Sequence, residues 1–223
     1  MQSSTASVVV TAREVGNDIV FSSAGGSFNL SAWTYANYGS HSANIDPSAP
    51  YVIMGVGAFF TEVYSDPVNY SAPSSFGSGG RSASSSGTNP SFGEQFGMFE
   101  ADGGQSGLLF VPDGYNSLDP IGPSSMTFEN ESFTSLGLTE GTYTWSWGIG
   151  DDADFFTLKI VTTPSVSISH QGGAITIEFE GIIQSTIDLG TPKSWEDISP
   201  QPTSPWTFTP STEIMFYRTK ETE

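Results

Sequence analysis

Apolar and polar residues alternate around position 145, and this pattern restricts the possible folds more than any other part of the sequence. Tyr143, Trp145 and Trp147 are separated by threonine or serine, and after the turn-forming stretch GIGDDAD the alternation resumes at residues 156–160. A period of two residues is that of a β-strand, whose side chains point to alternate faces of a sheet. Residues 142–160 therefore predict a β-hairpin with one buried face, and we expect its tyrosine and tryptophans in a core.

The rest of the first 160 residues predicts further short strands and no long helix, because no window carries an apolar stripe of period 3.6. Glycines 55 and 57 interrupt the most apolar segment and predict a bulge or a close backbone approach. Residues 34–50 and the Ser/Gly/Pro-rich stretch 71–93 are expected to be loops. Strands are expected at residues 6–13, 18–22, 27–33, 51–64, 94–100, 108–111 and 125–128.

These expectations define an all-β fold: an antiparallel, jelly-roll-like β-sandwich over residues 1–161. The stretch VTTPS at 161–165 marks a boundary, and a small β-rich module is expected over residues 165–220. So short a module buries a small core, with Trp206 in it, and we expect it to dock on the first domain or on a partner. Its strands are expected at residues 174–180, 182–187, 195–198, 206–209 and 214–218.

Composition narrows the partners and the compartment. The net charge is −18, from 24 acidic and 6 basic residues. This charge disfavours binding to nucleic acid or to anionic lipid, and it favours solubility. There is no cysteine, so disulfides and thiolate metal sites are excluded. No apolar run approaches the ~20 residues that span a bilayer, so direct membrane insertion is not expected. The first residues lack a signal-peptide pattern, so either the protein is cytosolic or a leader has been removed.

Several segments together resemble one class of bacterial proteins. They are VVVTAREVGNDIVFS with GSFNLSAW, SSFGSGGRSASSSG, FVPDGYNS, FENESFTSLGLTEGTYTWSWG and DDADFFTLKI. Over residues 8–160 the chain resembles exported proteins of Gram-negative bacteria that carry PEP-CTERM sorting tails. The resemblance implies export, a β-rich fold and a role at the cell surface or in an exopolysaccharide matrix, and it implies no catalytic residues.

The chain departs from that family after the hairpin, where the family's sorting tail is replaced by the second module. With its W-x-x-I segment, SPW turn and final FYR, this module resembles C-terminal modules of secreted proteins from Verrucomicrobia and Planctomycetes. The departure puts the anchoring route in question, whereas secretion, to the outside or to the cell surface, remains the expectation.

Three carboxylates in the hairpin turn, Asp151, Asp152 and Asp154, are a candidate Ca²⁺ site, since Ca²⁺ accepts six to eight oxygen ligands in flexible geometry. Their spacing matches neither the EF-hand loop nor the Gly-Gly-x-Gly-x-Asp repeat, and a solvated acidic turn is the favoured interpretation. No other cofactor is expected.

A candidate carbohydrate surface consists of Trp33, Tyr35, Tyr38 and Tyr51, which cluster around the expected 34–50 loop. Exposed aromatic patches usually mark a partner, here a polysaccharide, but most aromatic residues of β-proteins pack in the core. The favoured interpretation is therefore core or loop packing.

Catalysis has little support. The sequence contains no nucleophile motif that could pair with His41 or His170, and neither histidine has a second histidine at metal-ligand spacing. No pair of carboxylates stands out as the catalytic pair of a glycoside hydrolase. We assign no catalytic residue. The favoured function is a non-catalytic surface or matrix protein that self-associates by addition of its N-terminal strand to a neighbour's sheet. Carbohydrate binding is the alternative, and a glycan-active hydrolase is a weaker one.

Overall fold

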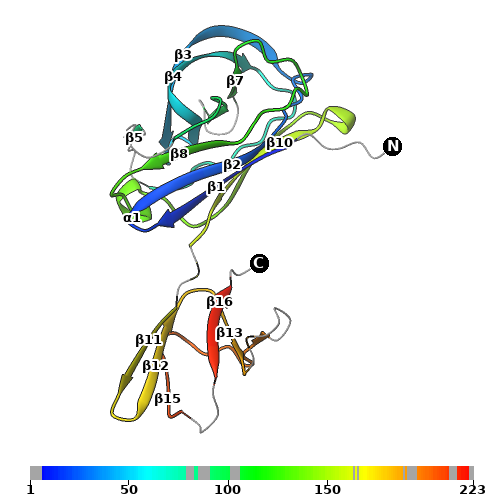
Figure 1. The fold of residues 1–223 in the computed structure, drawn as a ribbon. Helices are drawn as coiled ribbons and strands as arrows, with labels where there is room; N and C mark the ends of the chain where they lie inside the picture. The colour runs from blue at the N-terminus through cyan, green and yellow to red at the C-terminus, as the bar shows by residue number, and fades with distance from the viewer. Residues whose placement is uncertain are drawn as a thin grey trace. The chain divides into compact units, whose positions relative to one another are not determined.

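A computed structural model gives the fold (Figure 1). It describes residues 7–78, 83–84, 91–100, 106–162, 164, 166–187, 189, 195–210 and 215–220. The chain divides into two compact units, Met1–Val161 and Thr162–Glu223, and each is described by itself.

The first sheet of the N-terminal unit has five strands in the order β8-β2-β1-β10-β9. The predicted hairpins are confirmed: β1 pairs with β2, and β9 pairs with β10 with Trp145 opposite Phe156. The β1–β10 pairing is parallel, which departs from the expected fully antiparallel arrangement. The strands are β1 (Ser7–Val15), β2 (Asp18–Gly26), β8 (Ser124–Phe128), β9 (Gly141–Trp147) and β10 (Asp154–Ile160).

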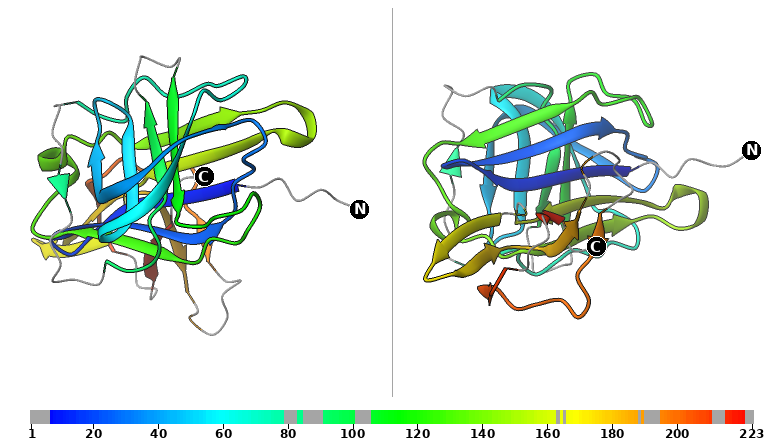
Figure 2. Two further views of the ribbon diagram at one scale, coloured as in Figure 1. Left: turned by 90° about the horizontal axis from the view of Figure 1, so that it is seen from above. Right: turned by 60° about the horizontal axis from the view of Figure 1, so that its bottom comes forward.

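The second sheet has the order β5-β3-β4-β6-β7, with β4 also pairing with β7. Its strands run across those of the first sheet rather than along them (Figure 2). They are β3 (Thr34–Asp46), β4 (Tyr51–Ser65), β5 (Ala83–Ser84), β6 (Gly97–Glu100) and β7 (Gly107–Pro112). Helix is confined, among the described residues, to α1 (Phe133–Leu136) and the single 3₁₀ turn η1 (Gly150–Asp152). The all-β, sandwich-like fold is confirmed.

Aromatic residues form the centre of the core. Trp145 and Trp147 are buried as predicted, while Tyr143 is half-buried at the margin of the same core. Phe28 contacts Trp147 and Phe156 with ring centroids 6.1 and 6.4 Å apart. The tilted and edge-on geometry suits the quadrupoles of the rings.

Two local predictions were wrong, and hydrogen bonding explains the first. Residues 27–33 alternate like a strand but are not one, because side chains take up their backbone groups: the amides of Phe28, Asn29 and Leu30 donate to Tyr115 Oη, Asp154 Oδ2 and Ser117 Oγ. Residues 34–50, expected to be a loop, contain the long strand β3 instead. Its first half is polar because it lies largely in solvent.

The expected backbone irregularity in β4 is confirmed at Gly55. The β3–β4 register shifts between Ser42 and Asn44, so β4 carries extra residues there. Gly55 has φ +101°, and a Cβ on it would lie 2.9 Å from the Glu94 carbonyl oxygen. A residue with a side chain would be strained by the positive φ and would also clash with this carbonyl oxygen.

The N-terminal strand has no free edge in this fold. β1 lies between β2 and β10 and pairs with both along most of its length. The expectation that this strand extends the sheet of another molecule is therefore corrected, because its backbone groups already serve its own sheet.

The C-terminal unit holds two three-stranded sheets, β11-β12-β15 and β14-β13-β16. Strand β11 was not predicted, because its sequence VSISHQ carries only two aliphatic residues. Trp206 is half-buried, with its ring stacked on Phe208 at 4.4 Å. The strands are β11 (Val166–Gln171), β12 (Ala174–Phe179), β13 (Ile182–Thr186), β14 (Glu196–Asp197), β15 (Trp206–Phe208) and β16 (Phe216–Lys220).

Three expected elements fall partly outside the described residues. They are the first strand, at position 6, the loop at 71–93, at positions 79–82 and 85–90, and the last strand, at position 214. Within the described part of the chain, no helix has the length and apolar character that crossing a membrane requires.

Candidate functional site

The four aromatic residues predicted to form a carbohydrate surface do not lie together. Trp33 is only 8% exposed, and its ring packs edge-on against Trp147 at 5.2 Å. Tyr51 is half-buried against Phe99, with 5.2 Å between ring centroids. Both residues therefore serve packing in this structure, while Tyr35 and Tyr38 are exposed.

An exposed aromatic patch does exist, on strands β3 and β4. It consists of Tyr35, Tyr38, Phe60 and Tyr64, of which the first three are 54%, 47% and 57% exposed. Tyr38 and Phe60 stack with centroids 5.0 Å apart and planes 9° apart, and Tyr35 contacts Tyr64 edge-on at 5.7 Å. Sequence reasoning missed Phe60, because it sits in the most apolar segment and reads as a core residue.

Strand register explains why these rings are exposed. Tyr38 lies opposite Glu62, and Glu62 lies opposite Val111 of β7. Residues that face each other across paired strands share a face, so Tyr38 lies on the same face as the buried Val111. The aromatic patch is thus the uncovered continuation of the face that carries the main core.

Tyr51 lies on the opposite face of the same sheet. There a second, smaller apolar cluster contains Ile53, Val63 and Phe110, with Tyr51 packed against it. Since Val63 and Tyr64 are adjacent in β4, the two clusters point to opposite sides. This sheet therefore carries aromatic residues on both faces, and only one group is open to solvent.

Carboxylates border the aromatic patch. Tyr38 Oη donates to Asp113 Oδ2 at 3.2 Å, and Tyr64 Oη donates to Glu62 Oε2 at 3.0 Å. Desolvation, and then the hydrogen bond to Glu62, raise the pKa of Tyr64 to about 12. Desolvation and Asp113 raise the pKa of Tyr38 as well. Both phenols are therefore neutral donors at physiological pH.

The patch combines flat apolar rings with acceptor oxygens at its edge. Such a surface stacks against an apolar ring face and accepts hydrogen bonds from hydroxyl or ammonium groups. The sequences of β3, β4 and β7 contain no lysine or arginine, so these strands supply no cationic partner for an anionic ligand.

The three aspartates of the candidate Ca²⁺ site are separated by their environments. Asp151 and Asp152 are exposed in η1, whereas Asp154 is 3% exposed. Both oxygens of Asp154 accept backbone amides, from Asn29 at 2.8 Å and from Phe155 at 2.7 Å. No group of three acidic or histidine side chains placed to hold a metal occurs among the described residues.

Among the carboxylates that the structure describes, Asp154 has the most strongly perturbed pKa. Its burial raises its pKa to about 7, although the two amide hydrogen bonds favour the charged form and act in the opposite direction. Perturbed carboxylates often mark active sites, but this side chain fixes the 27–33 segment against β10. We therefore interpret it as structural.

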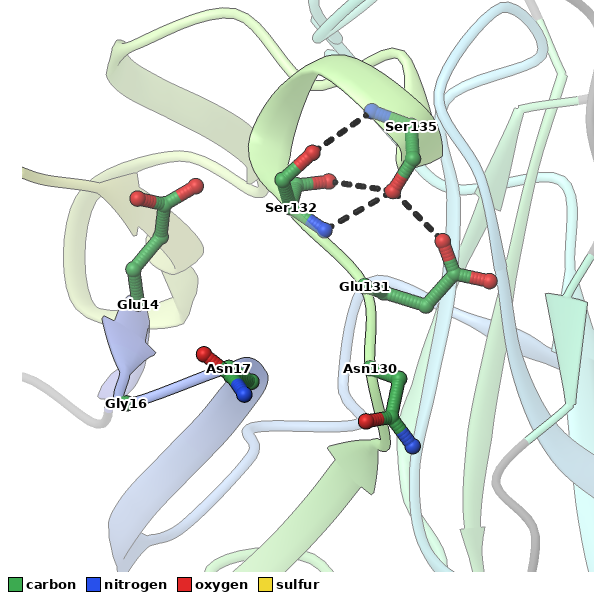
Figure 3. A pocket seen from close by; sticks show the side chains of 7 residues that line it. All are labelled: Glu14, Gly16, Asn17, Asn130, Glu131, Ser132 and Ser135. Atoms are coloured by element: carbon green, nitrogen blue, oxygen red, sulfur yellow. Dashed lines mark hydrogen bonds between the residues drawn. The ribbon is translucent and has the colours of Figure 1, made fainter.

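A shallow hollow lies between the β1–β2 turn and α1 (Figure 3). Its polar groups largely bond one another: Ser132 and Ser135 form a reciprocal capping box, and Ser135 Oγ also donates to Glu131. Glu14 Oε1 accepts the amide of Phe133 at 2.8 Å. These bonds stabilise a helix of a single turn and assemble no ligand site.

The histidines are far apart in the sequence and differ in setting. His41 Nδ1 lies 2.8 Å from Thr61 Oγ1, on the face opposite the aromatic patch, and its ring contacts Phe110 at 4.8 Å. Thr61 is fully buried, so its hydroxyl is not presented to a substrate. His170 is exposed on β11 of the C-terminal unit.

Comparisons with known proteins leave the aromatic patch as the main guide to function. No protein-family model, no curated protein and no solved structure matches this chain.

Proposed function

We propose that this protein is a secreted, non-catalytic component of a bacterial surface or extracellular matrix that binds polysaccharide through its aromatic patch. The single observation that carries the binding function is the stacked Tyr38–Phe60 pair, exposed on the antiparallel β3–β4 ladder. The proposal for the compartment rests on the sequence resemblance to exported matrix-associated proteins.

A binding role explains why these aromatic rings are exposed, whereas folding alone would favour burying them. Leaving about half of two stacked aromatic side chains in water forgoes roughly 25 cal/mol for each Å² of apolar area left uncovered. A sugar ring that covers Tyr38 and Phe60 recovers part of that free energy. Its hydroxyls meet the carboxylates of Glu62 and Asp113.

Charge selects the class of glycan. The patch is bordered by carboxylates in a chain of net charge −18, so a polysaccharide of uronic acids is repelled. Neutral sugars are accepted, and amino sugars gain from an ammonium group placed near the rings or the carboxylates. We therefore expect binding to chitosan and cellulose, and none to alginate.

The test is retention of the full chain on these three polysaccharides, followed by titration with soluble oligosaccharides. Replacing Tyr38 or Phe60 by alanine should weaken binding by about 1–3 kcal/mol, the range for loss of an aromatic contact. Ile149→Ala is the matched control, because Ile149 is also exposed and apolar but lies in the β9–β10 turn.

The variants must be shown to be folded before their binding is compared. Unfolding curves should show that all variants remain folded under the binding conditions, since about half of each truncated aromatic side chain already lies in solvent. Wild-type protein that passes unretained over chitosan, cellulose and alginate contradicts the binding function, and so does equal weakening by Ile149→Ala.

A further inference from the structure

Strand β11 of the C-terminal unit is an edge strand with exposed apolar residues. It pairs with β12 along its whole length and is terminal in the order β11-β12-β15, so its other side is unpaired among the described residues (Figure 1). All six of its residues are exposed, including Val166 at 44% and Ile168 at 63%. Proteins usually protect such edges with charges, proline or a bulge.

The face of β11 that carries Ile168 is continuous with the buried face of β12 in the same unit. Ile168 lies directly opposite Ile177, which is fully buried. Residues opposite each other share a face, so Ile168 points to the side on which Ile177 is covered. One more strand beside β11 both pairs its free backbone groups and covers Ile168.

We propose that this strand is β11 of a second copy of the chain, added antiparallel across a two-fold axis. An unpaired strand edge presents alternating amide and carbonyl groups, which another strand satisfies best. A two-fold axis at Ile168 places Ile168 opposite its own copy, Ser167 opposite Ser169 and Val166 opposite His170. The proposal is independent of the glycan-binding function.

Charge favours a second β11 as the occupant. The six residues contain no lysine, arginine, aspartate or glutamate, although the chain has 24 acidic residues. Two copies therefore meet without like charges in direct opposition, which would destabilise the pairing. The β-branched isoleucines at the centre suit a cross-strand pair on one face.

The first test is sedimentation of the full chain over a range of concentrations. Wild type should form a dimer, and Ile168→Lys should weaken it at least about tenfold, because two ammonium groups then oppose each other at the axis. Met215→Lys is the matched control: it makes the same change of charge at another exposed apolar residue of the unit, 44% exposed and beside β16. It should dimerise as the wild type does.

The second test uses the absence of native cysteine. Ile168→Cys should yield a covalent dimer under mild oxidation, since residues opposite each other in antiparallel strands are within disulfide reach. Met215→Cys should stay monomeric. A wild type that is monomeric at every concentration, an Ile168→Lys dimer of undiminished strength, or equal cross-linking of the two cysteine variants overturns the proposal.

Discussion

Polar side chains in this protein take the place of backbone partners that a β-ladder would supply. Tyr115 Oη accepts the amide of Phe28 at 2.7 Å and donates to the carbonyl of Asp119 at 2.8 Å. The Gln201 side chain bonds both backbone groups of Ile183, as a neighbouring strand would. Such side chains supply hydrogen-bond partners to the backbone that isolated sequence patterns do not reveal.

Asp154 gives a prediction with a defined pH dependence. Its pKa is raised from 3.8 to about 7, so the native state binds a proton that the unfolded state releases. Its stabilising effect is therefore complete below about pH 4 and is lost as pH rises through 7. Asp154→Asn removes this dependence, and it places an amide NH₂ against one of two backbone N–H donors, which costs about 1–3 kcal/mol.

Urea unfolding at pH 5 and pH 8 measures the effect. The loss of stability caused by Asp154→Asn should be larger at the lower pH, where the wild type is protonated. Asp152→Asn is the control, because Asp152 is exposed and should change stability little at either pH. An equal loss at both pH values would refute the assignment.

Arg218 connects two distant sequence pieces of the C-terminal module. Its guanidinium lies 4.5 Å over the Trp195 ring, and its Nε donates at 2.8 Å to Oε1 of the buried Gln184. Trp195 opens the W-x-x-I segment, and Arg218 ends FYR. The contact between Trp195 and Arg218 shows that these two sequence pieces pack against each other.

Arg218→Lys should destabilise the C-terminal unit by about 1–2 kcal/mol, because an ammonium group lacks the planar face and the Nε donor. Hydrogen exchange of the β13 amides should rise accordingly. Lys220→Arg, at a half-exposed pair with Asp197, should leave exchange nearly unchanged. Unchanged protection in Arg218→Lys would show that the stacking is not stabilising.

At the scale of elements, amphipathic strands could be predicted from the sequence and solvent-exposed ones could not. The β9–β10 hairpin could be predicted from its alternating sequence, because one of its faces is buried and the other is polar. The first half of β3 and all of β11 lie in solvent, so neither has a pattern to detect. Tyr35 and Tyr38 of the patch could be proposed from the sequence, but their partner Phe60 could not, because it lies in the most apolar segment and resembles a core residue.

The bulge in β4 is an element feature with a measurable cost of substitution. Gly55→Ala should destabilise the N-terminal unit by about 1–3 kcal/mol, because it combines a positive φ with a contact to the Glu94 carbonyl. Gly114→Ala shares the positive φ, at +73°, but a Cβ there meets nothing within 4 Å. Thermal unfolding should show a clearly smaller effect for Gly114→Ala; equal effects would mean that the close approach is unimportant.

At the scale of the whole molecule, the net charge should affect the proposed self-association. Two chains of net charge −18 repel each other, and salt screens that repulsion over a Debye length of about 8–10 Å. Pairing through the uncharged β11 should therefore strengthen as sodium chloride is raised, in sedimentation equilibrium with Ile168→Lys as the reference. A dimer that dissociates on addition of salt would indicate an interface held by ion pairs instead.

A bound sugar located by NMR would show directly whether the aromatic patch binds polysaccharide. With chitosan oligosaccharide added to the full chain, sugar C–H protons should show intermolecular NOEs to the rings of Tyr38 and Phe60, as stacking requires. NOEs that arise only from other side chains, or saturated binding without shifts of these two rings, would contradict the assignment of the aromatic patch as the polysaccharide site.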